Sequence, residues 1–283
     1  MGQRRLGVRK AEDAVGEWLL ALTFFGYLAA AVLAVAELYA SKLAKSVVFG
    51  AWVGFSAETL WLGQYLWIHL PGGSVSFLLC LAASVWVAVG FYLTVGRRRG
   101  WSMAGAFLFP IGFPVWFFAQ VGISHRWGGP FLGAPTWVVI NGLAIAASVA
   151  FFLLLAVFAI MYTEKERELK QKHVRLFYYQ LPALNAMDGW MARMLGIGWP
   201  WFTAALLLVA IARQASALAR WPDAWHLLGA LLVWVIYGVL FCGRFIWHWP
   251  GHRAAVGSML AFLGVLANFF AFDLMGVAHP GFW

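Results

Sequence analysis

The chain has 283 residues, of which 63% are hydrophobic and only 11% are charged, and its formal net charge is +9. This composition excludes an ordinary water-soluble domain, which needs far more charged residues to cover its surface. Long uncharged stretches recur along the sequence, each near the ~20 residues that cross a hydrocarbon core. They lack the alternation of polar and apolar residues that is typical of membrane β-barrel strands. We therefore predict an all-α polytopic membrane protein.

The apolar runs predict a bundle of about eight transmembrane helices within one domain, residues 1–283. The expected helices span residues 18–40, 46–68, 74–96, 101–122, 136–162, 195–213, 225–247 and 254–277. Residues 1–17 form an amino-terminal tail. Residues 163–194 form a charged cytoplasmic loop, whose start continues the fifth helix into water and whose later part suits a short interfacial helix opened by Pro182.

The distribution of Lys and Arg predicts that both termini lie outside. Positive residues mark the cytoplasmic side, and one set of loops is rich in them. Its members are Lys42, Lys45, Arg97, Arg98, Arg99, Lys165, Arg167, Lys170, Lys172, Arg175 and Arg253. The cluster of Arg4, Arg5, Arg9 and Lys10 argues against this orientation, because it would have to be translocated. We expect a multi-pass protein of the inner (cytoplasmic) membrane, with its basic loops beside anionic lipid and no nucleic-acid partner.

Four histidines fall on the outer side in this orientation. His69 ends the second helix, His125 lies in the loop GISHRWGGP, His226 begins the seventh helix, and His279 follows the eighth. Neutral imidazoles at a membrane edge, set among tryptophans, suit axial ligation of haem iron. The alternative is that they are ordinary interfacial residues, since aromatic and polar side chains commonly anchor helix ends at the headgroups.

Four segments in the second half of the chain carry a resemblance to known proteins. LPALNAMDGWMARMLGIGWPW fits a pattern of LP-x-L, a leucine–aspartate pair and GFP-x-LT before an apolar helix. RWPDAWHLLGA is similar to a tryptophan-rich WWD segment, WHWPGHRAA to W-x-G-R-R-A-A, and FFAFDLMGVAHPGF to YFGVNLLG-x-GLHSYG. With the eight-helix layout, these segments resemble the cytochrome c assembly family, haem-handling membrane proteins of the CcsA and HemX types. The resemblance implies haem as a cofactor and other assembly subunits, or a c-type cytochrome, as partners.

Carried over position by position, the resemblance implies that His279 is an outer ligand of haem iron. The family's partner histidine falls on Asn141, and its intramembrane histidine falls on Cys242. An amide does not ligate haem iron, and a lone buried cysteine is more often an apolar filler than a thiolate ligand.

The tryptophan-rich segment is reduced to Trp221, Asp223 and Trp225, and its two tryptophans would form the haem platform. Because only one family ligand remains, we expect the second imidazole to come from one of the other outer histidines, His69, His125 or His226.

Acidic residues within predicted helices are Glu37, Glu58 and Asp273. A charge at the centre of a span costs about 2.5–3.5 kcal/mol on insertion scales. Glu58 is either a proton-transfer group facing a polar cavity or a structural carboxyl bonded to Gln64 or to another helix, and we favour the structural interpretation. Arg244, near the inner end of the seventh helix, is expected to snorkel to the headgroups.

The leading functional hypothesis is haem handling at the outer membrane face. The alternative, favoured by the missing family ligands, is a haem-free accessory or structural subunit of a respiratory or electron-transfer complex built on the same fold. Pro110 and Pro114 predict a kink in the fourth helix, which makes a transporter the third hypothesis. No hydrolase or nucleotide-binding motif occurs, so we assign no catalytic residue.

Overall fold

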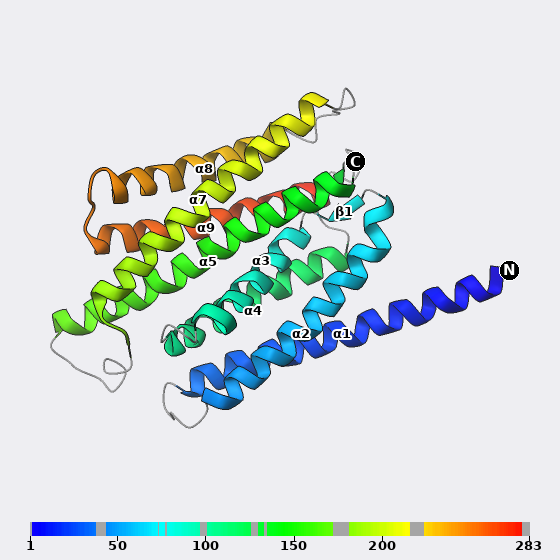
Figure 1. Ribbon diagram of the computed structural model, residues 1–283, viewed down its shortest axis with the longest axis horizontal. Coiled ribbons are helices and arrows are strands. Elements are labelled where there is room, and N and C mark those ends of the chain that lie inside the picture. The colour runs from blue at the N-terminus through cyan, green and yellow to red at the C-terminus, as the bar shows by residue number, and fades with distance from the viewer. Residues whose placement is uncertain are drawn as a thin grey trace.

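The computed structural model describes residues 2–37, 44–72, 74–76, 78–96, 101–125, 130–132, 135–171, 181–215 and 224–278. Within these ranges the chain is a bundle of long helices (Figure 1). They are α1 (Gly2–Glu37), α2 (Ala44–His69), α3 (Leu78–Phe91), α4 (Gly105–Ser124), α5 (Pro135–Gln171), α7 (Leu184–Ala215), α8 (Ala224–Phe245) and α9 (Gly251–Ala278). The predicted all-α membrane bundle is confirmed, with one long helix for each expected span.

Seven of these helices are long and apolar enough to cross a membrane, by length and composition. The remaining helix, α2, has 26 residues, but Glu58, Gln64 and its tryptophans lower its mean hydropathy. It runs antiparallel to α1 and lies beside it (Figure 1). We therefore treat α2 as a crossing helix as well.

Several boundaries differ from the expected ones. Helix α1 begins at Gly2, so the expected tail is mostly a continuation of the first helix. The separate interfacial helix at Pro182 was wrong, because α7 is one helix from Leu184 to Ala215. Met187, Met191 and Met194 lie at helical spacing and are all buried in the core, so the apolar stripe of α7 begins well before residue 195.

The described residues also include two short strands that the sequence did not predict. Strand β1 (Ser74–Ser76) pairs antiparallel with β2 (Pro130–Leu132), and α3 consequently starts at Leu78. A π-helical turn, Tyr92–Gly96, extends α3, and a 3-10 turn, Ser102–Ala104, precedes α4. Helix α4 continues through both of its prolines, and α5 continues through its charged end to Gln171 as expected.

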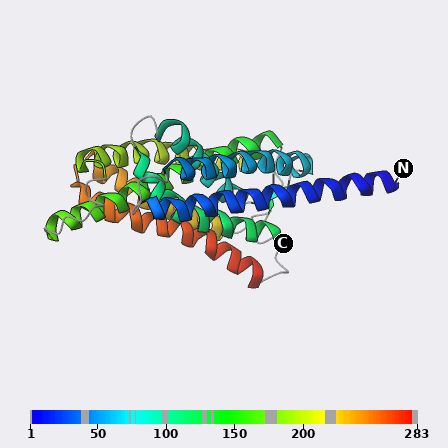
Figure 2. The same cartoon turned by 90° about the horizontal axis from the view of Figure 1, so that it is seen from below.

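The two ends of the bundle carry different sets of helix termini (Figures 1 and 2). The C-terminal ends of α2, α4 and α9 and the N-terminal ends of α5 and α8 lie at the end that also carries β1 and β2. The first and last described residues lie at the same end, as an even number of crossings requires. We call this the outer end, after the orientation that the basic residues predict, and the opposite one the inner end.

Helix α5 is the centre of the bundle. It packs against α3, α7 and α9, and 78% of its most apolar segment is buried, against 22% for α8. Helices α1 and α2 form a pair at one side (Figure 1). They cross where Gly26 faces Gly50 and Gly54, since a Cβ on Gly26 would lie 2.6 Å from the backbone nitrogen of Gly54. Small residues at such crossings let membrane helices approach closely.

Candidate functional site

The outer end carries two predicted histidines with described side chains, His69 and His125. His69 is the last residue of α2, and its Nδ1 lies 3.0 Å from the carbonyl oxygen of Tyr65. The two rings stack with centroids 4.2 Å apart and an interplanar angle of 16°. His125 is the C-cap of α4, and its Nδ1 lies 2.9 Å from the carbonyl oxygen of Val121 and 3.1 Å from Ser124 Oγ.

These contacts set which ring nitrogen carries the proton. A carbonyl oxygen only accepts hydrogen bonds, so we infer that Nδ1 of each ring donates and that the neutral imidazole keeps its lone pair on Nε2. A backbone-anchored Nδ1–H is common in histidines that bind a metal through Nε2. The same contacts satisfy carbonyl groups at the ends of α2 and α4, which is a structural role that needs no ligand.

An apolar cluster joins the ends of the helices that carry these two histidines. Trp61, Leu62 and Leu79 are its buried centre. Tyr65 and Leu66, just before His69, and Ile123, two residues before His125, pack against that centre. His69 and His125 therefore flank one apolar cluster at the outer end.

The other predicted site residues are less fully described. His226 and Trp225 lie in the first turn of α8, at the outer end, but their side chains lie outside the described residues. Trp221 and His279 lie outside the described residues altogether. The last described residue before His279 is Ala278, which ends α9 at the outer end. The structure thus brings the helix ends that carry His69, His125 and His226 to one end of the bundle.

Two positions matched to family histidines carry other side chains. Asn141, in the outer half of α5, is only 4% exposed, and among the described residues its Oδ1 has no hydrogen-bond partner. Leaving a buried acceptor unpaired costs about 1–3 kcal/mol. Cys242, at the position of the family's intramembrane histidine, is a free thiol. Asn141 therefore departs from the two-histidine site that the resemblance implies.

Within the described residues, no group of three His, Cys, Asp or Glu side chains is arranged to hold a metal ion. Two open grooves lie away from the outer histidines. One lies between α1 and the inner half of α2, with a volume near 460 Å³, and Lys45 and Ser46 are its polar lining residues. The other, near 760 Å³, lies towards the inner end and is lined by Trp101, Arg193 and Phe245, among others.

The inner end holds a polar network that sequence reasoning missed. Arg244 of α8 donates through Nη2 to Asp188 Oδ2 of α7 and through Nη1 to the carbonyl oxygen of Trp249, 3.2 Å away. These contacts hold the Arg244 guanidinium at the inner end of the bundle, and its reach to the headgroups stays a prediction. A Cβ on Gly251 would lie 2.6 Å from Tyr162 Oη and 2.8 Å from Asp188 Oδ1. The first residue of α9 therefore packs directly against Tyr162 and Asp188.

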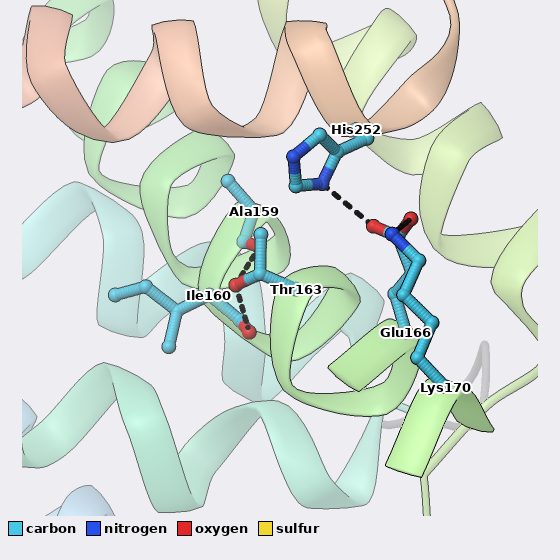
Figure 3. Close-up of polar contacts among 6 residues, drawn as sticks. All are labelled: Ala159, Ile160, Thr163, Glu166, Lys170 and His252. Atoms are coloured by element: carbon cyan, nitrogen blue, oxygen red, sulfur yellow. Dashed lines mark hydrogen bonds and ion pairs between the residues drawn. The ribbon is translucent and has the colours of Figure 1, made fainter. Parts of the chain in front are cut away.

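A second set of contacts joins α5 to the start of α9 (Figure 3). Glu166 Oε2 lies 2.7 Å from His252 Nδ1, and Glu166 Oε1 lies 2.7 Å from Lys170 Nζ one turn along α5. Lys165, the residue before Glu166, donates to the carbonyl oxygens of Leu181 and Pro182, at 2.7 and 2.6 Å. These contacts join the charged extension of α5 to the residues just before α7 and to the start of α9 at the inner end.

The two networks connect segments that are distant in sequence. Asp188 belongs to the segment LPALNAMDGW, and Gly251 and His252 belong to WHWPGHRAA, two of the segments that carry the family resemblance. An acid early in α7 and an arginine at the end of α8 were the available signals. Because Asp188 falls in the predicted loop of residues 163–194 and Arg244 in a predicted helix, the sequence did not indicate that they form a pair.

Glu58 is buried in the middle of α2, and Tyr27 Oη of α1 donates to its Oε2. The prediction that it bonds to a group on another helix is confirmed, whereas Gln64 lies against Gly16 of α1. Tyr27 was not identified from the sequence, because nothing in an apolar stretch marks which tyrosine faces a carboxyl group.

Comparisons with known proteins identify related sequences. A family model described as "Cytochrome C assembly protein" matches residues 73–279. The chain is 20% identical over 226 residues to cytochrome c biogenesis protein CcsA of Trieres chinensis, and the aligned region covers 68% of this chain and 71% of that protein. It is 23% identical over 104 residues to CcsA of Citrus sinensis, covering 35% of this chain and 32% of that protein. With CcsA of Oryza sativa the identity is 24% over 119 residues, covering 40% of this chain and 36% of that protein.

The match thus spans most of the first relative but only about a third of the length of the other two. No solved structure matches this chain.

Proposed function

Since this chain belongs to the cytochrome c assembly protein family, we propose that it acts in cytochrome c biogenesis as a haem-handling protein of the cytoplasmic membrane. Haem, when bound, is the group passed on towards a c-type cytochrome. The protein's own part is to hold the iron between imidazoles at the outer end and to cover the porphyrin with aromatic side chains. Other assembly subunits or the c-type cytochrome itself are the proposed partners.

His279 is the proposed first ligand, and a ring contact between α4 and α9 favours His125 as the second. The rings of Phe118 and Phe270 lie with centroids 3.9 Å apart, and both helices run from there towards the outer end. His125 follows Phe118 by seven residues, and Ala278 follows Phe270 by eight. At 1.5 Å per residue these distances are roughly 10 and 12 Å, so the two helix ends reach similar heights.

The lengths of α8 and α9 beyond their contact disfavour His226 as the second ligand. Helices α8 and α9 meet near the inner end, where a Cβ on Gly257 would lie 2.5 Å from Leu240 Cδ2. From that contact Ala278 lies 21 residues along α9, roughly 31 Å, while His226 lies 14 residues along α8, roughly 21 Å. His69 ends α2, which packs mainly on α1 and α3, whereas α9 packs mainly on α5 and α8. The proposal therefore assigns His226 and His69 lower priority than His125.

A haemin titration of the purified protein tests this function. The wild type is expected to give the Soret and visible bands of six-coordinate, low-spin haem. His125→Ala and His279→Ala are each expected to give a five-coordinate, high-spin spectrum, because one axial nitrogen is lost. His252→Ala is the matched control, since it removes an imidazole at the inner end.

Two results would contradict the proposal at different levels. Absence of a Soret band with and without added haemin would remove haem handling altogether. A low-spin spectrum that survives His125→Ala but is lost in His226→Ala or His69→Ala would keep the function and reassign the ligand.

The buried amide of Asn141 supports a second candidate function, a haem-free accessory subunit of a respiratory or electron-transfer complex. An imidazole at that position would serve haem, whereas the amide leaves a buried acceptor without a partner among the described residues. Isolation of the native complex separates the two functions. Co-purification with respiratory subunits and no haem bound to this chain would favour the accessory role.

A further inference from the structure

Glu58 is placed by close packing of α1 on α2. Gly54 lies one turn before it, and a Cβ on Gly54 would lie 2.5 Å from Cδ1 of the Tyr27 ring. The ring therefore packs directly against the bare backbone of α2 at Gly54, and its hydroxyl donates to Glu58 Oε2. On its other side the Tyr27 ring meets Trp116 of α4 edge to face, with centroids 5.8 Å apart. The carboxyl group of Glu58 is fully buried where these three helices meet.

Polar atoms without a hydrogen-bond partner gather on the α4 side of Glu58. Among the described residues these are Glu58 Oε1 and both amide atoms of Gln120. The indole N–H of Trp116 faces the same carboxyl group of Glu58. Trp116 is 2% exposed and Gln120 9% exposed, so none of these groups is satisfied by bulk solvent. Gln120 lies one turn beyond Trp116 on the same face of α4. Buried polar groups of this kind are normally bridged by ordered water.

We propose that Glu58, Trp116 and Gln120 enclose a site for buried water through which Glu58 exchanges its proton with the outer end of the bundle. Oε2 accepts the hydrogen bond from Tyr27, so the proton of the neutral acid sits on Oε1, where water is the acceptor. In the exchange the Oε1–H bond breaks and an O–H bond forms on that water, while another O–H bond of the same water breaks and its proton passes on towards the outer end. Glu58 is left as a carboxylate that accepts from Tyr27 O–H and from Trp116 N–H.

The geometry of α4 gives the route a direction. Trp116, Gln120 and Ser124 follow one another at i, i+4 and i+8, so they lie along one face of the helix towards the outer end. Ser124 is exposed there, and its Oγ lies 3.1 Å from His125 Nδ1. Gln120 is thus the single polar side chain of this row between the buried pair at Glu58 and the exposed helix end. Among the described residues, Tyr27 is the titratable group that contacts Glu58 from a neighbouring helix.

Infrared difference spectroscopy of the full-length protein in lipid vesicles tests the proposal. Glu58→Gln should remove a carboxylic-acid C=O band, and that band should shift in the wild type when H2O is replaced by D2O. Gln120→Leu should slow the shift by at least roughly tenfold, the factor given by a barrier rise of about 1.4 kcal/mol. Tyr27→Phe should keep the band and move it to higher frequency, because the carboxyl group loses a hydrogen bond.

Gln64→Leu is the matched control, since it removes a glutamine six residues beyond Glu58 on α2 and away from the row on α4. It should leave the exchange rate unchanged. A Glu58 band that does not exchange, or that exchanges equally fast in Gln120→Leu, would overturn the proposal. So would the absence of any band that Glu58→Gln removes. Size-exclusion elution and near-ultraviolet circular dichroism of each variant exclude misfolding as the cause.

Discussion

The ion pair between Asp188 and Arg244 offers the sharpest test of how the inner end is held together. Their side chains are 28% and 16% exposed, which places the pair between a surface salt bridge and a fully buried one. Exposed pairs contribute about 0.2–1 kcal/mol, and loss of one partner of a buried pair costs about 3–5 kcal/mol. We therefore expect Asp188→Asn to lower the free energy of unfolding by about 2 kcal/mol. The coupling energy between the two residues should be about 1.5 kcal/mol.

A double-mutant cycle measures that coupling. Asp188→Asn, Arg244→Gln and the double variant are unfolded at equilibrium in mixed micelles with increasing SDS. The control cycle uses Glu166→Gln and Lys170→Gln, whose lysine side chain is 67% exposed, and we expect a coupling of only about 0.3–0.5 kcal/mol there. A coupling energy for Asp188 and Arg244 no larger than in the control cycle would refute the reasoning. The contact would then be a screened surface pair rather than the joint between α7 and α8.

Two glycine substitutions probe close approaches, in the same unfolding assay. Gly251→Ala should destabilise the protein by about 1–3 kcal/mol, because its Cβ would lie 2.6 Å from a tyrosine hydroxyl and 2.8 Å from the carboxylate of Asp188. Gly26→Ala should cost a similar amount of about 1–3 kcal/mol, because the nearest atom, 2.6 Å away, is the backbone nitrogen of Gly54, which moves only if the helices separate. Gly264→Ala, with no atom within 4 Å of the added Cβ, is the control, and stability equal to this control in either variant would contradict the packing argument.

The number and order of the helices followed from the sequence because lipid imposes a strong constraint. The backbone N–H and C=O groups of each apolar run must be hydrogen-bonded within the run across a fixed membrane thickness. A helix of ~20 residues meets this requirement. The same rule gives no information outside the hydrocarbon layer. The extension of α1 back to Gly2, the fusion of the expected interfacial helix into α7 and the pairing of β1 with β2 all lie at or beyond that boundary.

The sequence predicted at which end of the bundle each candidate site residue lies, but not which side chains contact each other. Alternation of the crossings was enough to assign the helix ends that carry His69, His125 and His226 to one end of the bundle. Which residue faces Glu58 or Arg244 depends on how helices rotate against each other. Those rotations are set by small-residue contacts such as Gly54 against the Tyr27 ring, which hydropathy does not report. The bonds from Tyr27 to Glu58 and from Arg244 to Asp188 were therefore visible only in the structure.

The family match begins at residue 73, after α2 ends. The two proposed haem ligands lie within the matched region, whereas part of the proposed water site lies before it. His125 lies within the matched region, as do Trp116 and Gln120, whereas Tyr27 and Glu58 lie before it. Helix α4 carries the haem-ligand candidate at its end and one wall of the proposed water site in its middle. The sites are nevertheless separable, because loss of an imidazole at the end of α4 leaves Glu58 and its neighbours in place. Haemin binding that persists in Glu58→Gln, and a Glu58 infrared band that persists in His125→Ala, are the results that two independent sites require.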